Sequence, residues 1–131
     1  TWLGKAPAFV ADDAKATTLG VYADQSAAIA YRDFGNWRSV FFGGISMTDE
    51  FFNALARKSG AWVAGDAGDA IYASQSFFTI HAMWDGEKNL RFLQPSKVTD
   101  LTTGQVVSTN ANALKINMKR GETRWFYLEK P

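Results

Sequence analysis

His81 is the only histidine of the chain and therefore the first candidate for a catalytic base. A histidine in that role needs a nucleophile or an orienting carboxylate within hydrogen-bonding reach. His81 lies between Thr79 and Met83 in an alternating, strand-like segment, and no such partner can be assigned to it. With no cysteine in the chain, the usual ligand set of a zinc site is missing too. We interpret His81 as a structural, hydrogen-bonded residue and predict neither a metal site nor a cofactor.

The 13 Asp and Glu residues are numerous enough to include the carboxylate pair that a glycoside hydrolase uses. These residues occupy positions that are typical of turns and helix caps. We therefore predict no catalytic residue and no enzymatic activity. A small hydrolase with a carboxylate pair stays as an alternative. Asp66 and Asp69, in the segment AGDAGDA, could offer oxygen ligands to calcium, but their spacing does not match an EF-hand loop. A flexible linker is the better interpretation of that segment.

Of the five tryptophans, Trp2 lies near a predicted loop. Two others, Trp37 and Trp84, lie next to predicted turns. Their neighbours Asn36, Arg38 and Asp85 are polar. Exposed aromatic faces beside polar groups are suited to stacking on sugar rings and to contacting hydroxyl groups. We therefore consider these five residues as a candidate carbohydrate-binding site. The alternative is that both indole rings belong to the core.

The composition is that of a folded domain, since 47% of the 131 residues are hydrophobic and 15% are aromatic. The net charge is +1 and the basic residues are scattered, which excludes an electrostatic footprint for nucleic acid. No apolar run approaches the length of a membrane span, so no membrane partner is expected.

Most of the chain has the pattern of strands. From Ala70 to Leu128, apolar and polar residues alternate between glycine-centred turns such as Asp85-Gly86, a strong hairpin signal. We predict an α+β fold that is mostly β: an antiparallel β-sandwich or meander with one amphipathic helix from a β-α-β element. In the last strands, Leu114, Ile116 and Met118 should face inward.

The helix is predicted over about 46–60, with Ser46 or Thr48 as its N-cap and Gly60 just beyond its end. Its apolar stripe consists of Phe51, Phe52, Leu55 and Ala56. The strand before it, Val40 to Phe42, should be covered on both faces, and Trp62-Val63 should begin the strand after it. We expect two lobes, 1–66 and 67–131, joined at the glycine-rich segment; one continuous domain is the alternative.

The stretch YRDFGNWRSVFFGGISMTDEFFNALARKSGAW is similar to the last strand and helix of a glutamine-amidotransferase-like domain. A second stretch, DAIYASQSFFTIHAMWDGEKNLRFLQPSKVTDLTTGQVV with RGETRWFYL, is similar to the small β-sandwich that follows such a domain. Together the two stretches resemble the C-terminal accessory region of bacterial β-galactosidase-type glycoside hydrolases and related uncharacterised secreted proteins. The resemblance covers about residues 30–128. It implies an accessory role, and the amidotransferase cysteine is absent, so that activity is not implied.

From these observations we expect a non-catalytic accessory or structural domain of a larger bacterial, carbohydrate-processing protein. Its partners would be other domains of that protein or a second copy of itself, and a polysaccharide is the alternative. A chain that begins at Thr1 suggests a processed or longer protein, and a secreted or periplasmic location is favoured.

Overall fold

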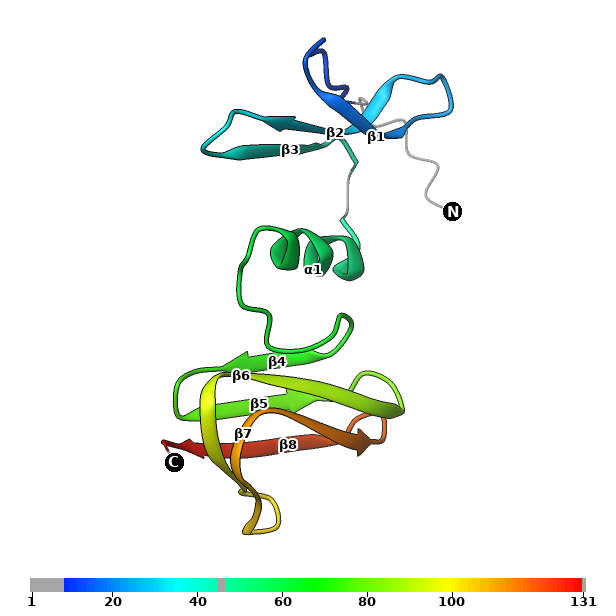
Figure 1. The fold of residues 1–131 in the computed structure, drawn as a ribbon. Coiled ribbons are helices and arrows are strands. Elements are labelled where there is room, and N and C mark those ends of the chain that lie inside the picture. The colour runs from blue at the N-terminus through cyan, green and yellow to red at the C-terminus, as the bar shows by residue number, and fades with distance from the viewer. Residues whose placement is uncertain (1–8, 45–46, 131) are drawn as a thin grey trace. The chain divides into compact units, whose positions relative to one another are not determined.

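The structure is a computed structural model that describes residues 9–44 and 47–130. These residues form two antiparallel sheets, with strand orders β1-β2-β3 and β4-β5-β8-β6-β7, and one helix (Figure 1). The mostly β, sandwich-like α+β fold is thereby confirmed. The elements are Thr17–Val21 (β1), Ala27–Asp33 (β2), Arg38–Phe42 (β3), Asp49–Lys58 (α1), Ala70–Ala73 (β4), Phe77–His81 (β5), Gly86–Asp100 (β6), Gln105–Met118 (β7) and Thr123–Glu129 (β8).

The chain divides into two compact units between Met47 and Thr48. We expected the boundary in the glycine-rich segment around Asp66, which would have placed the helix in the first lobe. Instead α1 belongs to the second unit, where its Arg57 donates a 3.0 Å hydrogen bond to the carbonyl oxygen of Gly65.

The first unit is a three-stranded meander. A tight turn joins β1 to β2, in which the Asp24 carboxylate accepts hydrogen bonds from Ser26 and Gln25 has a φ of 68°. Among the described residues of this unit, only Ala30 is buried. The expectation that Val40 to Phe42 is covered on both faces is wrong, because β3 is an edge strand and these residues are half-buried.

The second unit has a strand order that the turn signals did not reveal. β4 pairs with β5 and β6 pairs with β7, while β8 lies between β5 and β6. The Asp85-Gly86 turn therefore joins two strands that are not neighbours, and our hairpin interpretation of it is wrong. The predicted β-α-β element is also absent, because β3 and β4 belong to different sheets and Trp62-Val63 is not a strand.

The core of the second unit follows the predicted alternation. Phe78 and Ile80 of β5 are each 1% exposed, and Phe126 of β8, which lies opposite Phe78, is also 1% exposed. The ring of Phe92, from β6, meets the ring of Phe78 edge-on with centroids 5.5 Å apart. The long β6–β7 hairpin, which curves visibly in Figure 1, supplies the other core residues, including Leu90, Val98 and Met118. The inward orientation of Leu114, Ile116 and Met118 is confirmed.

Helix α1 has the predicted end signals. Thr48 is the N-cap, and its hydroxyl oxygen accepts a 3.3 Å hydrogen bond from the backbone N–H of Phe51. Gly60 has a φ of 81°, as a glycine that terminates a helix requires. The other N-cap candidate, Ser46, lies outside the described residues. None of the helix residues is buried: Phe52 is 66% exposed, and the other three residues of the apolar stripe are half-buried, so the stripe is only partly covered.

Leu55→Ala tests how far α1 is packed. Truncating a buried leucine to alanine lowers the stability of a protein by about 2–5 kcal/mol. The apolar stripe in the sequence led us to expect that Leu55 would be buried. Leu55 is only half-buried, so we now expect a loss below about 2 kcal/mol, measured from urea unfolding midpoints. A loss within the full range for a buried leucine would show that α1 is packed more tightly than its exposure indicates.

Candidate binding surface

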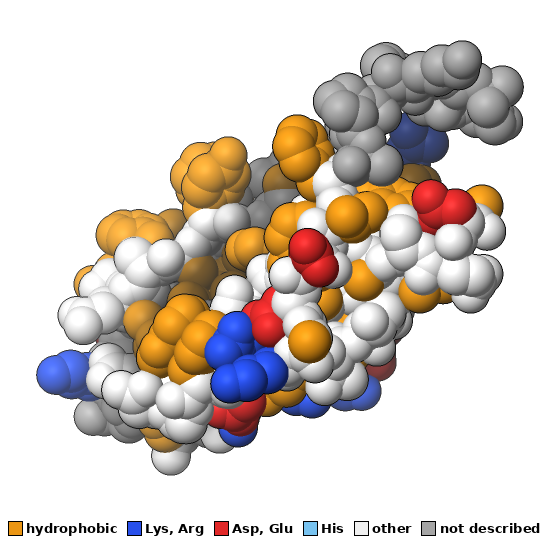
Figure 2. Space-filling model, turned by 90° about the horizontal axis from the view of Figure 1, so that it is seen from above, with side chains coloured by type: hydrophobic (Ala, Val, Ile, Leu, Met, Phe, Trp, Pro, Cys, Tyr) orange, Lys and Arg blue, Asp and Glu red, His pale blue; other side chains and the backbone are white. Residues whose placement is uncertain are grey.

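The outer face of the five-stranded sheet carries a group of exposed aromatic side chains. Because side chains alternate along a strand, the residues next to the buried Phe78 and Phe126 point outward. Phe77 on β5 is 53% exposed, and Trp125 on β8 is 55% exposed. Tyr127 and the still more exposed Tyr72 belong to the same face. Large hydrophobic side chains are exposed elsewhere in the chain as well, and Figure 2 shows several projecting among polar groups.

These side chains fall into two rows across the sheet. In the first row, Tyr72 of β4 lies opposite Thr79 of β5, which lies opposite Trp125 of β8. In the second row, Phe77 lies opposite Tyr127, with ring centroids 5.3 Å apart, and Tyr127 lies opposite Thr99 of β6. We name these two rows, Tyr72–Thr79–Trp125 and Phe77–Tyr127–Thr99, the outer aromatic face. It combines aromatic rings with threonine hydroxyl groups and contains no charged side chain.

Polar pairs lie at the margins of the outer aromatic face. On one side, Nδ1 of His81 is 2.8 Å from Oγ1 of Thr123, the kind of hydrogen bond that we expected of a structural histidine. On the other side, Nζ of Lys97 lies 3.0 Å from a carboxylate oxygen of Glu129. Both partners of this ion pair are substantially exposed, so it contributes little to stability. The Lys97–Glu129 pair at this margin therefore carries no net charge.

Sequence reasoning missed the outer aromatic face. We singled out Trp37 and Trp84 because they lie next to turns, whereas the exposed rings of this face lie within strands. A usable signal was present: aromatic residues are adjacent in the sequence at 77–78 and 125–127, which places rings on both faces of one strand. One of those two faces must remain outside the core.

The predicted residues Asn36, Trp37 and Arg38 are together at the β2–β3 turn of the first unit, and all three are exposed. One face of the Trp37 ring is occupied, because it stacks on Phe34 with centroids 4.0 Å apart and planes 3° apart. Nε of Arg38 donates a 3.1 Å hydrogen bond to the carboxylate of Asp33. Only the second face of the indole is left for a ligand.

The other predicted pair, Trp84 and Asp85, belongs to the second unit. Trp84 is 60% exposed, and the guanidinium of Arg120 lies 6.0 Å from its ring centroid. The Asp85 carboxylate accepts a 2.7 Å hydrogen bond from the backbone N–H of Arg120, which is a structural role. Trp37 and Trp84 belong to different units, so each is a separate candidate position.

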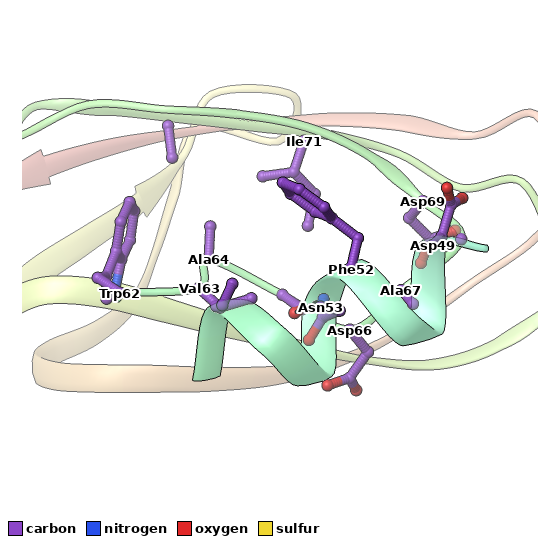
Figure 3. Close-up of a pocket in the computed structure, with 14 residues that line it drawn as sticks. Asp49, Phe52, Asn53, Trp62, Val63, Ala64, Asp66, Ala67, Asp69 and Ile71 are labelled. Carbon is purple, nitrogen blue, oxygen red and sulfur yellow. Dashed lines mark hydrogen bonds between the residues drawn. The ribbon is translucent and has the colours of Figure 1, made fainter. Parts of the chain in front are cut away.

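An open groove of about 510 Å³ lies beside α1 in the second unit (Figure 3). Phe52 points from the helix toward Ile71 of β4, and Trp62 and Val63 line another part of the groove. Polar contacts connect the helix to the groove wall. Besides the hydrogen bond of Arg57 to Gly65, Nδ2 of Asn53 donates a 3.4 Å hydrogen bond to the same carbonyl oxygen.

Asp66 and Asp69 in the wall of this groove are anchored rather than free. The Asp66 carboxylate accepts hydrogen bonds from Asn89 at 2.6 Å and from Arg91 at 3.0 Å. Asp69 forms an ion pair of 2.9 Å with Lys88. Our interpretation of this segment as a flexible linker is therefore wrong, and its carboxylates are already occupied by cationic and amide groups. Among residues 9–44 and 47–130, no three His, Asp or Glu side chains group as they would to hold a metal ion.

The environment of Asp66 has a predictable effect on stability at low pH. Burial alone would raise the pKa of this carboxyl, but the hydrogen bonds from Asn89 and Arg91 and the nearby guanidinium charges outweigh it and lower the pKa below 3.8. A carboxyl with a lowered pKa stabilises the fold at neutral pH, and that contribution disappears as the pH falls through the folded-state pKa. Asp66→Asn should therefore reduce stability at pH 7 more than at pH 2.5, measured by urea midpoints. An equal reduction at both values would contradict the pairing.

No protein-family model matches the chain, and no curated protein or solved structure matches it either. In the described part of the chain, no helix has the length and apolar character needed to cross a membrane. A function is therefore argued first from the geometry and chemistry of the chain itself.

Proposed function

We propose that this chain is a non-catalytic accessory region of a larger, carbohydrate-processing bacterial protein, and that it works by binding through the outer aromatic face. The observation that supports the proposal is the exposure of Tyr72, Phe77, Trp125 and Tyr127 on one face of one sheet. Exposed hydrophobic groups that are contiguous, unlike scattered ones, mark surfaces that contact another molecule. Tyrosine and tryptophan are enriched in such contacts because one side chain offers both a large apolar area and a hydrogen-bonding group.

The leading partner in this proposal is another domain of the parent protein. The resemblance to accessory regions of β-galactosidase-type enzymes supports it, as does the sparse burial in the first unit. A three-stranded sheet gains independent stability from a hydrophobic face that is covered, and Ala30 alone is buried among the described residues of that unit. Covering these apolar surfaces in a larger protein would supply the missing burial.

Oxidative footprinting tests this proposal directly. The full-length gene product and the isolated 131-residue chain are exposed to hydroxyl radicals, and modification of the four rings is quantified by mass spectrometry. We expect lower modification of Tyr72, Phe77, Trp125 and Tyr127 in the full-length product, or in the isolated chain once a ligand is bound. The buried ring of Phe126 is the internal control and should be weakly modified in all samples. Equal, high modification of the four rings in every sample would contradict a binding role for this face.

The second candidate is a carbohydrate-binding module, and a specific observation favours it. In the outer aromatic face, Thr79 lies between two aromatic residues of its row and Thr99 lies beside Tyr127 at the end of the other row, a combination of rings and hydroxyl groups that suits sugars. The residues that the sequence pointed to, Trp37 and Trp84, are each exposed but each has an aromatic or cationic neighbour on its ring. They form a weaker basis for such a site than Tyr72 and Trp125 do.

A further inference from the structure

We propose that the row Tyr72–Thr79–Trp125 binds a linear, uncharged polysaccharide, with sugar rings stacked on Tyr72 and Trp125 and a sugar hydroxyl bonded to Thr79. This inference rests on the second candidate function, a carbohydrate-binding module on the outer aromatic face, and a domain of the parent protein would compete for the same rings. It goes further by choosing the class of ligand and the residues that contact it.

The spacing of the two rings supports a chain-like ligand. Tyr72 and Trp125 occupy the same row, two strands apart, on β4 and β8. Neighbouring strands are separated by about 4.8 Å, so their positions on the backbone lie roughly 10 Å apart. That separation is close to the length of two linked pyranose rings. A single sugar would reach one aromatic ring, whereas an oligosaccharide laid across the strands would reach both.

The chemistry of the row supports a sugar as the ligand. One face of a pyranose ring presents C–H groups that stack on the negative face of an aromatic ring, and its edge presents hydroxyl groups. The row offers these functions in order: the ring of Tyr72, the hydroxyl of Thr79 and the indole of Trp125. The two rings are strongly exposed, at 77% and 55%, which leaves them available for stacking.

The charge distribution supports an uncharged ligand. Neither row of the outer aromatic face contains a carboxylate or a cationic side chain. The nearest pair on β6 and β8, Lys97 with Glu129, is neutral as a unit. A surface that selects an acidic polysaccharide needs unpaired cationic groups to balance its ligand. The outer aromatic face presents none in its rows.

Binding is measured with the full 131-residue chain by affinity electrophoresis and isothermal titration calorimetry. The probes are three soluble neutral polysaccharides, mixed-linkage β-glucan, glucomannan and arabinoxylan, with acidic polygalacturonate for comparison. We expect binding to at least one neutral polymer, and affinity for its hexasaccharide at least about tenfold above that for its disaccharide. Tyr72→Ala and Trp125→Ala should each weaken binding about tenfold or more, a loss of about 1.4 kcal/mol. Thr79→Val, which keeps the shape and removes the hydroxyl, should weaken it less.

Leu19→Ala is the control, because it removes a comparably exposed hydrophobic side chain (54%) from β1 of the first unit, outside every candidate site, and should leave binding unchanged. Melting curves verify that each variant remains folded, as substitutions at exposed positions should. The inference is overturned if no neutral polymer binds, if polygalacturonate binds in preference, or if binding survives both Tyr72→Ala and Trp125→Ala. Absence of sugar binding together with protection of the same rings in the full-length gene product would refute the polysaccharide and support a protein partner. The proposed function would then stand without this inference.

Discussion

Phe126→Ala should destabilise the second unit by about 3–5 kcal/mol, the usual result of truncating a buried phenylalanine. Phe126 is 1% exposed and lies opposite Phe78 in the central pairing of β5 with β8. Its removal leaves a cavity in the middle of the core, where residues from β5, β6 and β7 would have to move to fill it. Urea unfolding followed by far-UV circular dichroism measures the loss.

The matched control for this variant is its neighbour in the sequence. Trp125→Ala removes an even larger side chain from the same strand, but on the outer face, where 55% of the residue is exposed. Truncation there creates no core cavity, so we expect a loss below about 1 kcal/mol. Equal losses for the two variants would mean that both faces of β8 are covered in the isolated chain, in conflict with an available outer aromatic face.

Lys88→Met should also be costly, because it separates a buried ion pair. The side chains of Lys88 and Asp69 are 8% and 7% exposed, and Nζ lies 2.9 Å from the carboxylate oxygen. Removing the cation leaves a carboxylate with little access to water. Breaking a buried pair in this way costs about 3–5 kcal/mol. The loss is measured at pH 7 by urea unfolding.

Two comparisons separate the charge effect from a general effect of substitution. Lys115→Met breaks the pair of Lys115 with Glu87, whose side chains are 68% and 50% exposed, and should cost no more than about 1 kcal/mol. The double variant Lys88→Met with Asp69→Asn should recover part of the loss. Its amide oxygen can still accept the hydrogen bond that Asp69 takes from the backbone N–H of Met83, and no charge remains buried. If the double variant is no more stable than Lys88→Met alone, the lost stability comes from the packing of the Lys88 side chain and not from the ion pair.

The local features of the fold could be predicted from the sequence. The N-cap Thr48 and the terminating Gly60 act within one helical turn, so their residue types alone indicate where α1 begins and ends. The inward-facing Ile116 and Met118 follow from the two-residue period of a strand in the same way. Strand neighbours could not be predicted, because pairing between β5 and β8 joins residues about half the second unit apart in sequence. The residues of the Asp85-Gly86 turn do not indicate whether the strands before and after it pair with each other; β5 and β6 do not.

The candidate site was harder to predict than the fold. In β8, Trp125 and Phe126 are both aromatic, and their alternation says that they lie on opposite faces without saying which face is buried. That choice is made by the core residues of other strands, such as Phe78 and Phe92. Lys88 shows the same limit of prediction from sequence. A lysine is expected to be exposed to solvent, and only the position of Asp69 in the fold explains why Lys88 is buried.

The central position of β8 bears on how the second unit folds during synthesis. β4 with β5, and β6 with β7, are hairpins of neighbouring segments that can form as soon as each has left the ribosome. The two hairpins can join into one sheet only when β8, residues 123–129, is available to pair with both β5 and β6. This strand is the last of the unit to be synthesised. Until then β5 and β6 each present an unpaired edge, and such edges are where nascent chains aggregate or recruit chaperones. Pairing of the seven-residue strand β8 thus completes the five-stranded sheet, and β8 is the last strand of this unit to leave the ribosome.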